Sequence, residues 1–372
     1  MHICSPNPYS IYRYLLIFFI LDFLYVSVLL GQGRLELLNA DISRGVLENG
    51  ELLRILEGNV HARQDTIELF CDLVTYYQSQ KKAILEKNVK IVRGKGTLTA
   101  ETVTYFEEQK LAIAKDNVHV WQPGQELFTD YLEYYYESDY TIARQGVKIK
   151  DANERVTVTA EEGEYNPSKN LTFVEKNAHL SRVDSTGKDT LHIFARRMEY
   201  LFGENPRAVA IDSVRIVREN LQAACDSAVY EVDEETAFLE IGPQAIQENN
   251  KMTGLQMQMK FENLDLREIR VRGEANVVNV LDSISSKQNE LAGREIIMYI
   301  NNRQLDELWA ISNARSFYHL IEKDEEKGFN SVSADTIKLF FVEGTLDSID
   351  VKGGSQGTFY PPDYRGKIES DF

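Results

Sequence analysis

The sequence predicts an all-β protein, a creased antiparallel sheet built from about nine repeats of roughly 29 to 40 residues. Three observations predict this fold class: the composition, a tripeptide that recurs through the chain, and an apolar alternation that slips by one residue at the same place in each repeat. The 372 residues include 19 Tyr and 17 Phe but only 8 Pro, which suits strands better than helices. No long window has the 3.6-residue period of a helix.

The first 33 residues form a segment separate from the repeats. Residues 14–30 are apolar except for Asp22 and a few Tyr and Ser, and the small-x-small triplet Gly31-Gln32-Gly33 follows. This pattern is typical of a secretory signal peptide cleaved after Gly33. An uncleaved anchor is the alternative, because 17 apolar residues reach the lower limit for a bilayer span. In both cases we expect the remainder to be exported, and Cys4 precedes the apolar run, so it is no lipid-attachment site.

A marker tripeptide sets the length of the repeat. It occurs as Gly58-Asn59-Val60, Lys87-Asn88-Val89, Asp116-Asn117-Val118, Gln145-Gly146-Val147, Lys176-Asn177-Ala178 and Asp212-Ser213-Val214. The first four copies are 29 residues apart, and looser copies end at Ala245, Ala275 and Ala314, where insertions stretch the period to between 30 and 40. We expect one strand of each repeat to begin at the marker, with apolar residues such as Val89 inward and polar ones such as Lys90 outward.

A small corner residue, followed by apolar residues three and five positions later, marks the other strand. The nine corner residues are Cys71, Ala100, Thr129, Ala160, Ala195, Cys225, Gly254, Gly293 and Ala334. Before the corner the apolar positions share its parity, as in Leu69 and Cys71, whereas after it they shift to Val74 and Tyr76. Such a slip predicts a bulge at which the strand bends and keeps its apolar face inward. Repeated down the stack, the bend folds the sheet into a trough.

The repeat also accounts for residues that could be taken for a metal or redox site. His61, His119 and His179 share one outward position, which favours a solvated face over a metal cluster. Cys71 and Cys225 are corner residues five repeats apart, so we expect two free thiols and no disulfide. The acidic runs 233–235 and 322–327 fall at hairpin turns, where solvation is the default and calcium binding the alternative.

The net charge of -17 argues against nucleic acid as a partner, because that affinity comes from Lys and Arg neutralising phosphates. No nucleophile motif, glycine-rich phosphate loop or HExxH helix is present. We therefore predict no catalytic residues, no cofactor and no enzyme activity.

Several segments together resemble a known family. Leu56-Glu57-Gly58-Asn59-Val60, Cys71-Asp72, Leu85-Glu86-Lys87-Asn88-Val89 and Ala100-Glu101 are similar to the OstA-like (LptA-type) repeats of lipopolysaccharide transport proteins. The resemblance is clearest from Arg54 to Tyr230 and persists, weaker, to about Tyr360. It implies a semi-open β-jellyroll in the periplasm, or associated with a membrane, that shields the acyl chains of lipopolysaccharide. It also implies partners: other lipopolysaccharide transport proteins of the inner and outer membranes, and further copies joined head to tail through edge strands.

An acyl chain is also the ligand that such a trough would suit on physical grounds. An apolar trough that no other segment covers needs a ligand, and acyl chains contribute about 0.8 kcal/mol for each CH2 removed from water. We expect the head group to stay in solvent with divalent cations, because the protein itself is anionic. The inward residues expected to hold the lipid are Val60, Ile67, Leu69, Val74, Tyr76, Val89, Ile91, Leu98, Val103, Tyr105, Val118, Val120, Leu132, Tyr134, Val147, Ile149, Tyr165, Ile193, Met198 and Tyr200.

Two alternatives remain at this point: a closed β-solenoid that acts as a scaffold or adhesin, and a parallel β-helix enzyme acting on polysaccharide. Strand direction separates them from the trough, because solenoid coils are parallel and hairpins are antiparallel. The expected organisation is residues 1–33 as signal peptide or anchor, 34–55 as a lead-in segment, 56–360 as the repeat domain and 361–372 as a C-terminal tail.

Overall fold

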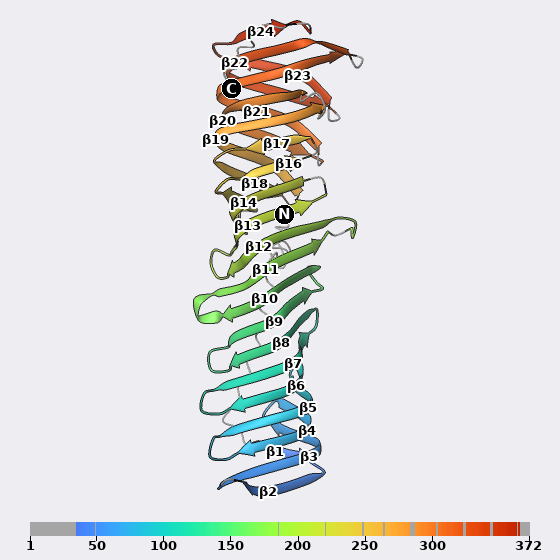
Figure 1. The fold of residues 1–372 in the computed structure, drawn as a ribbon, viewed down its shortest axis with the longest axis vertical. Helices are drawn as coiled ribbons and strands as arrows, with labels where there is room; N and C mark the ends of the chain where they lie inside the picture. Colours follow the sequence, from blue (N-terminus) through green and yellow to red (C-terminus); the bar gives the residue numbers. More distant parts are fainter. Residues whose placement is uncertain are drawn as a thin grey trace, which may run out of the picture. The chain divides into compact units, whose positions relative to one another are not determined.

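The computed structural model describes residues 35–48, 50–184, 186–219, 221–247, 249–262, 265–282, 287–302, 304–322, 325–342, 345–362 and 364. These residues form 24 β-strands and one short 3-10 helix, with no α-helix among them (Figure 1). The expected signal peptide, Cys4 and residues 365–372 of the expected tail lie outside this part of the chain. The described residues divide between Ala208 and Val209 into an N-terminal unit and a C-terminal unit.

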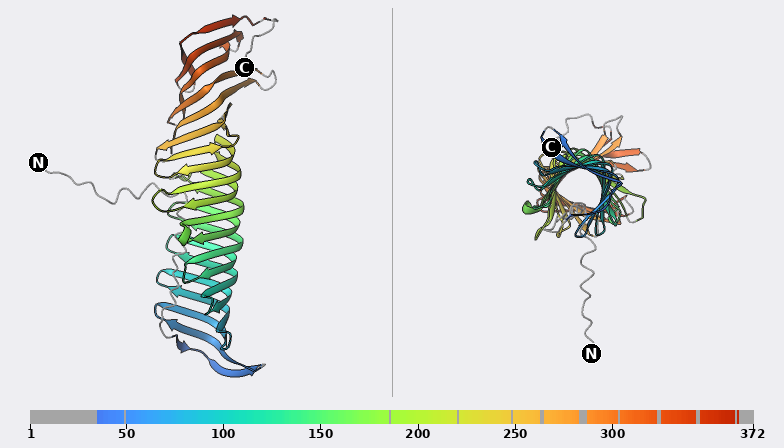
Figure 2. Two further views of the ribbon diagram at one scale, coloured as in Figure 1. Left: turned by 90° about the vertical axis from the view of Figure 1, so that its left-hand side faces the viewer. Right: turned by 90° about the horizontal axis from the view of Figure 1, so that it is seen from below.

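The N-terminal unit is an antiparallel meander in which each strand from β3 to β12 pairs with the next along the chain (Figure 2). The ten strands are β3 (Glu51–Gln64), β4 (Ile67–Tyr77), β5 (Lys82–Arg93), β6 (Gly96–Phe106), β7 (Leu111–Gln122), β8 (Gln125–Tyr135), β9 (Tyr140–Asp151), β10 (Val156–Asn166), β11 (Leu171–Val183) and β12 (Thr190–Leu201). Two-residue turns such as Gly94-Lys95 and Pro123-Gly124 alternate with longer ones, which agrees with the expected hairpins.

The lead-in segment belongs to this sheet. Two short strands, β1 (Glu36–Asn39) and β2 (Ile42–Glu48), both pair with β3, one on each side of its crease. Their exposed apolar side chains include Leu37, Ile42 and Leu47, of which Leu47 is 73% exposed.

A crease crosses every strand pair of the meander. At each one, two marker residues lie opposite a single residue of the neighbouring strand: Lys87-Asn88 opposes Asp72, because Leu73 pairs with Glu86 and Phe70 with Lys90. The predicted bulge is thereby confirmed, but the extra residue lies in the marker strand. The expectation that a strand begins at the marker is wrong, since β5 starts at Lys82 and runs through it. The bulge keeps the pairing continuous through the bend.

The marker sequence explains why the chain bends there. Both residues before the inward Val have positive φ, 64° for Lys87 and 53° for Asn88, for example. Asn and Gly tolerate this left-handed conformation best. The acidic residue after the corner residue holds the bend, as Asn88 Nδ2 donates to Asp72 Oδ2 at 2.7 Å. The same contact joins Asn59 to Asp41 at 2.9 Å.

Side chains of the N-terminal unit line up in rows across the strands. Inward side chains are buried or half-buried, and the corner row consists of small side chains and valines such as Cys71, Val89 and Ala100. One outward row repeats every four strands, twice the sequence repeat. It reads His61, Phe70, Lys90, Thr99, His119, Phe128, Lys148, Thr159, His179 and Phe194.

The histidines of this outward row are more covered than a solvated face would leave them. His61 stacks on Phe70 with ring centroids 4.3 Å apart, His119 on Phe128 at 4.2 Å and His179 on Phe194 at 4.3 Å. The described residues contain no group of three or more His, Cys, Asp or Glu side chains that could hold a metal ion. Cross-strand aromatic packing therefore explains these positions.

The C-terminal unit continues the pattern from Val209, within β13 (Arg207–Arg218), with longer and partly broken strands. Its other strands are β14 (Leu221–Glu231), β15 (Thr236–Glu240), β16 (Gln244–Gln247), β17 (Asn250–Thr253), β18 (Gln256–Glu262), β19 (Asp265–Asp282), β20 (Lys287–Asn301), β21 (Gln304–Glu322), β22 (Glu325–Val342), β23 (Thr345–Lys352) and β24 (Gln356–Tyr360). At the crease the chain breaks into two strands, β15 and β16, with Ile241 and Gly242 between them, and both of these residues have positive φ. β23 and β24 likewise pair with the two halves of β22.

The predicted fold class is confirmed. The pairings of β1–β12 with one another and of β14–β24 with one another are all antiparallel, as in a β-jellyroll of creased hairpins. The parallel coils that the solenoid and β-helix alternatives require do not occur among these strands. Cys71 and Cys225 are buried free thiols, as expected.

Candidate functional site

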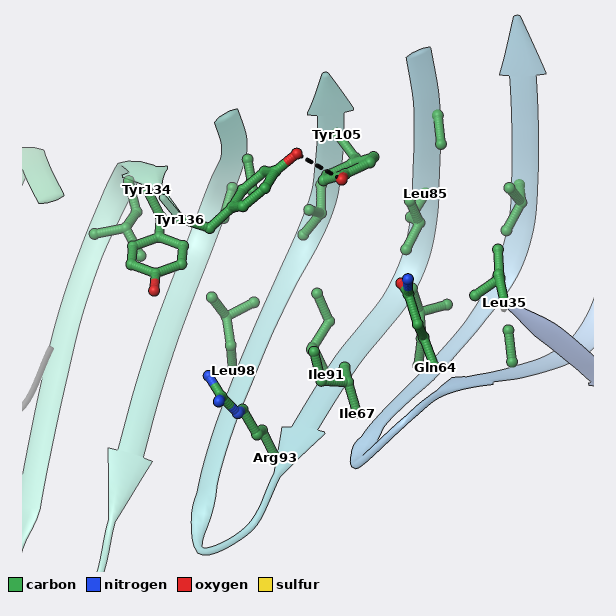
Figure 3. A pocket seen from close by; sticks show the side chains of 18 of the residues that line it. Leu35, Gln64, Ile67, Leu85, Ile91, Arg93, Leu98, Tyr105, Tyr134 and Tyr136 are labelled. Atoms are coloured by element: carbon green, nitrogen blue, oxygen red, sulfur yellow. Dashed lines mark hydrogen bonds between the residues drawn. The ribbon is translucent and has the colours of Figure 1, made fainter. Parts of the chain in front are cut away.

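A cavity of about 220 Å³ lies on the inward face of the N-terminal unit (Figure 3). It extends across the strands from β3 to β9. Its lining residues are Leu35, Leu56, Val60, Ala62, Gln64, Ile67, Leu69, Val74, Ala83, Leu85, Ile91, Arg93, Gly96, Leu98, Val103, Tyr105, Ala112, Ala114, Val120, Leu132, Tyr134, Tyr136 and Thr141.

An alternation of large and small side chains keeps this interior open. In one inward row, tyrosines on the even strands face small residues on the odd strands, so that Ala83 pairs with Tyr76 and Tyr105, and Ala112 pairs with Tyr105 and Tyr134. Ala114 follows in the next row, opposite Val103 and Leu132. Alanine leaves space that a larger residue would fill, because interiors otherwise pack without voids.

Tyrosine hydroxyls stand at one end of the cavity. The hydroxyls of Tyr105 and Tyr136 are 2.7 Å apart, and the Tyr134 hydroxyl donates to Asp139 Oδ1 at 2.6 Å (Figure 3 shows the first of these). Burial, together with the hydrogen bond to Tyr136, raises the pKa of Tyr105 far above its ordinary value. Burial also raises the pKa of Tyr136. These phenols therefore stay neutral at physiological pH.

Gln64 and Arg93 stand at the other end, where β3 and β5 finish (Figure 3). Between the two ends the walls are aliphatic, with Ile67, Ile91 and Leu98 among them. Arg93 is the one charged side chain among the lining residues within the described part of the chain. The site thus combines a long apolar middle with a single cationic group at one end.

The chemistry of the cavity suits hydrocarbon. Its volume exceeds the roughly 150 Å³ of engineered apolar cavities that bind benzene. Each CH2 moved into it from water would contribute about 0.8 kcal/mol. The lining offers no nucleophile beside a general base, and the corner thiols are inert because burial raises the pKa of both Cys71 and Cys225 to about 11.

The structure brings eleven of the twenty predicted lipid-binding residues to this cavity: Val60, Ile67, Leu69, Val74, Ile91, Leu98, Val103, Tyr105, Val120, Leu132 and Tyr134. The other nine also lie on inward positions, yet they do not line it: Tyr76, Val89, Val118, Val147, Ile149, Tyr165, Ile193, Met198 and Tyr200. Val89, Val118 and Val147 are only 1 to 2% exposed, because they pack into the crease. On β10 and β12, several inward side chains are almost fully covered, with Tyr165 and Met198 each 1% exposed.

The predicted lipid-binding residues include none from the half of each odd-numbered strand that precedes the marker. Ala83, Leu85, Ala112 and Ala114 line the cavity from that half, and the signal was present, since they alternate with the parity of Val89 and Val118. Arg93 was missed because it stands next to a glycine turn, where a charged residue suggests solvent. Its even spacing from Val89 and Ile91 indicates an inward direction.

No helix in the described residues is both long and apolar enough to cross a membrane.

Fold and site together define an antiparallel β-jellyroll protein with an apolar cavity inside its sheet. Residues 32–190 match the family model of OstA-like proteins, and this range contains the whole cavity. The resemblance seen in the marker and corner residues is therefore confirmed over residues 32–190.

One solved structure with a similarity to the chain is that of LptH from Pseudomonas aeruginosa, described as the LptA-homologous periplasmic component of the lipopolysaccharide transport device. The match has 16% sequence identity and a TM-score of 0.19, and it covers 37% of this chain and 76% of LptH. That score is too low for an element-by-element comparison. No curated protein matches the chain.

Proposed function

We propose that this protein binds lipopolysaccharide by its acyl chains and carries it through the periplasm. The observation that carries the proposal is an aliphatic cavity inside the region that matches the OstA-like family model. A cavity of this kind suits an apolar ligand, and the resemblance to LptA-type repeats implies that the ligand is lipid A. The function is transport without chemical change.

The cavity supports sliding better than tight capture. Apart from its two ends it offers few polar groups that could fix a ligand in one place, so an acyl chain would be held by non-directional burial. Weak, repeated contacts of this kind are what movement along a protein requires.

We further propose that copies of this chain, or related transport proteins, add to the sheet edges. At the first edge of the N-terminal unit, β1 and β2 carry exposed apolar side chains, including Ile42 at 50% and Leu47 at 73%. In the C-terminal unit, β23 and β24 expose Ile349 at 46% and Phe359 at 55%. Exposed apolar edge strands invite strand addition.

Native mass spectrometry of the chain, purified gently from a lipopolysaccharide-producing host, tests the proposal. We expect a bound mass that corresponds to lipid A or its glycoforms. Val103→Asp, which places a carboxylate on a 3% exposed lining position, should reduce the bound fraction about tenfold or more. If Val103→Asp does not fold, Ala114→Leu provides a second test. It fills the same space without adding a charge and should also reduce the bound fraction.

Thr99→Asp is the matched control. It lies on the same strand as Val103, on the outward row between Lys90 and His119, and should leave the bound lipid unchanged. A folded wild-type protein that carries no lipid under these conditions would contradict the proposal.

A further inference from the structure

The inward position four residues after the last marker residue is polar on every odd strand from β3 to β11. It holds Gln64, Arg93, Gln122, Asp151 and Arg182, each at or next to the end of its strand. Together with Gln125 on β8, these residues form a polar row along one end of the interior.

From β7 onward the polar row is paired. Gln122 Nε2 donates to Gln125 Oε1 at 2.6 Å, and Gln125 Nε2 donates to Asp151 Oδ2 at 2.9 Å. The other Asp151 oxygen accepts from the backbone N–H groups of Asn153 and Glu154 at 2.8 and 2.9 Å. Arg182 Nη2 donates to Glu154 Oε2 at 3.4 Å. These groups are thus hydrogen-bonded within the protein.

Arg93 differs from the rest of this row. Its Nη1 is buried and has no hydrogen-bond acceptor, and the guanidinium forms no ion pair with any described residue. Its cross-strand neighbours are Ile67 and Gly96, which offer no side-chain acceptor. The same side chain lines the apolar cavity (Figure 3).

Arg93 as a whole is half-buried, and this arrangement leaves its buried Nη1 without an acceptor. A buried charged donor without an acceptor is destabilising, and buried charges in proteins are normally paired. The guanidinium presents its donors in a planar fork that matches the oxygens of a phosphate or carboxylate. The space beside it, however, is lined by hydrocarbon.

We propose that Arg93 binds the anionic oxygens of an amphiphile whose hydrocarbon chain lies in the cavity. The ligand class is an alkyl or acyl chain that carries a phosphate or carboxylate group. The inference rests on the proposed function, in that hydrocarbon occupies the cavity, and it changes the expectation that the whole head group stays in solvent. Arg93 fixes which way round the lipid enters.

Isothermal titration calorimetry of the purified full chain tests the inference with dodecyl phosphate, dodecanol and inorganic phosphate. The wild type should bind dodecyl phosphate about tenfold more tightly than dodecanol, as one charge-assisted contact provides. Arg93→Met should bind both alkyl ligands equally, and Arg93→Lys should keep part of the preference. Retained dodecanol binding shows that the variant is folded.

Arg182→Met is the matched control, because Arg182 occupies the equivalent position on β11 but is paired with Glu154 and does not line the cavity. It should leave the phosphate preference unchanged.

An unchanged preference in Arg93→Met would overturn the inference while dodecanol binding still supports the proposed function. No dodecanol binding by the wild type would instead overturn the proposed function. Inorganic phosphate that binds as tightly as dodecyl phosphate would identify a free-anion site and overturn the lipid assignment.

Discussion

At the scale of single residues, the first two residues of the marker tripeptide both form the bulge and hold it in place. Their positive φ angles place two residues opposite one residue of the neighbouring strand. The side chain of the second, Asn88 for example, donates a hydrogen bond to Asp72 on that strand. This explains why Asn, Gly and Asp recur there, whereas the following inward residue is Val or Ala. The bend is therefore encoded locally, once per repeat.

Asn88→Ala tests this local encoding. Alanine loses the hydrogen bond to Asp72 and tolerates φ of 53° poorly, so the free energy of unfolding should fall by about 1–2 kcal/mol. Asn88→Gly should cost less, because glycine adopts this φ freely and Gly146 occupies the equivalent position on β9. Urea denaturation measures both. Equal losses in the two variants would mean that the side-chain hydrogen bond alone matters.

At the scale of strands, the rows of side chains have a period of four strands on the outward face. His61, His119 and His179 are each covered by a cross-strand Phe, with Lys and Thr on the two strands between. Four strands correspond to two of the 29-residue repeats. This longer period is difficult to detect along the sequence but is clear when the paired residues of neighbouring strands are compared. The register set by the bulges aligns residues that are far apart in sequence.

The outward row predicts a pH response at His119. Burial lowers its pKa below the ordinary 6.5, Glu126 opposes this shift and Lys150 adds to it. Since the folded state disfavours the protonated imidazole, the contribution of His119 to stability is present above pH 6.5 and is lost as the pH falls through its folded pKa. NMR titration should give a midpoint below 6.5. Lys150→Met should raise this midpoint and Glu126→Gln should lower it; a wild-type midpoint above 6.5 would mean that burial does not dominate the pKa of His119.

At the scale of the whole molecule, each unit ends in edge strands that carry apolar side chains, which soluble monomers usually avoid. β1 and β2 share the edge of β3, and β23 and β24 share the edge of β22. The two edges therefore have the same construction, a pair of short strands on either side of a crease. That construction offers another chain two places for strand addition.

Leu47→Lys on β2 and Phe359→Lys on β24 test this arrangement. Both replace an exposed apolar edge residue by a charge that disfavours strand addition. Analytical ultracentrifugation should show concentration-dependent association of the wild type and its loss in either variant. Thr104→Lys, within β6, is the control and should associate normally. Association that survives both edge variants would point to a different surface.

The strand class, the antiparallel hairpins and the crease could be predicted from the sequence alone, because alternation with period two and two recurring residues of positive φ are local properties. The sequence also indicated which side chains face inward, including Val103 and Tyr105. Which part of that interior holds the cavity could not be predicted, because this depends on the side chains that face one another across neighbouring strands. The tyrosines of the inward row are separated by Ala83 and Ala112 within the cavity, by Thr141 at its last strand, and by Thr172 beyond it, where Tyr165 and Tyr200 are buried. The side chains on neighbouring strands determine whether space remains and whether Arg93 has an acceptor. Those neighbours are set by the strand register and not by proximity in the sequence.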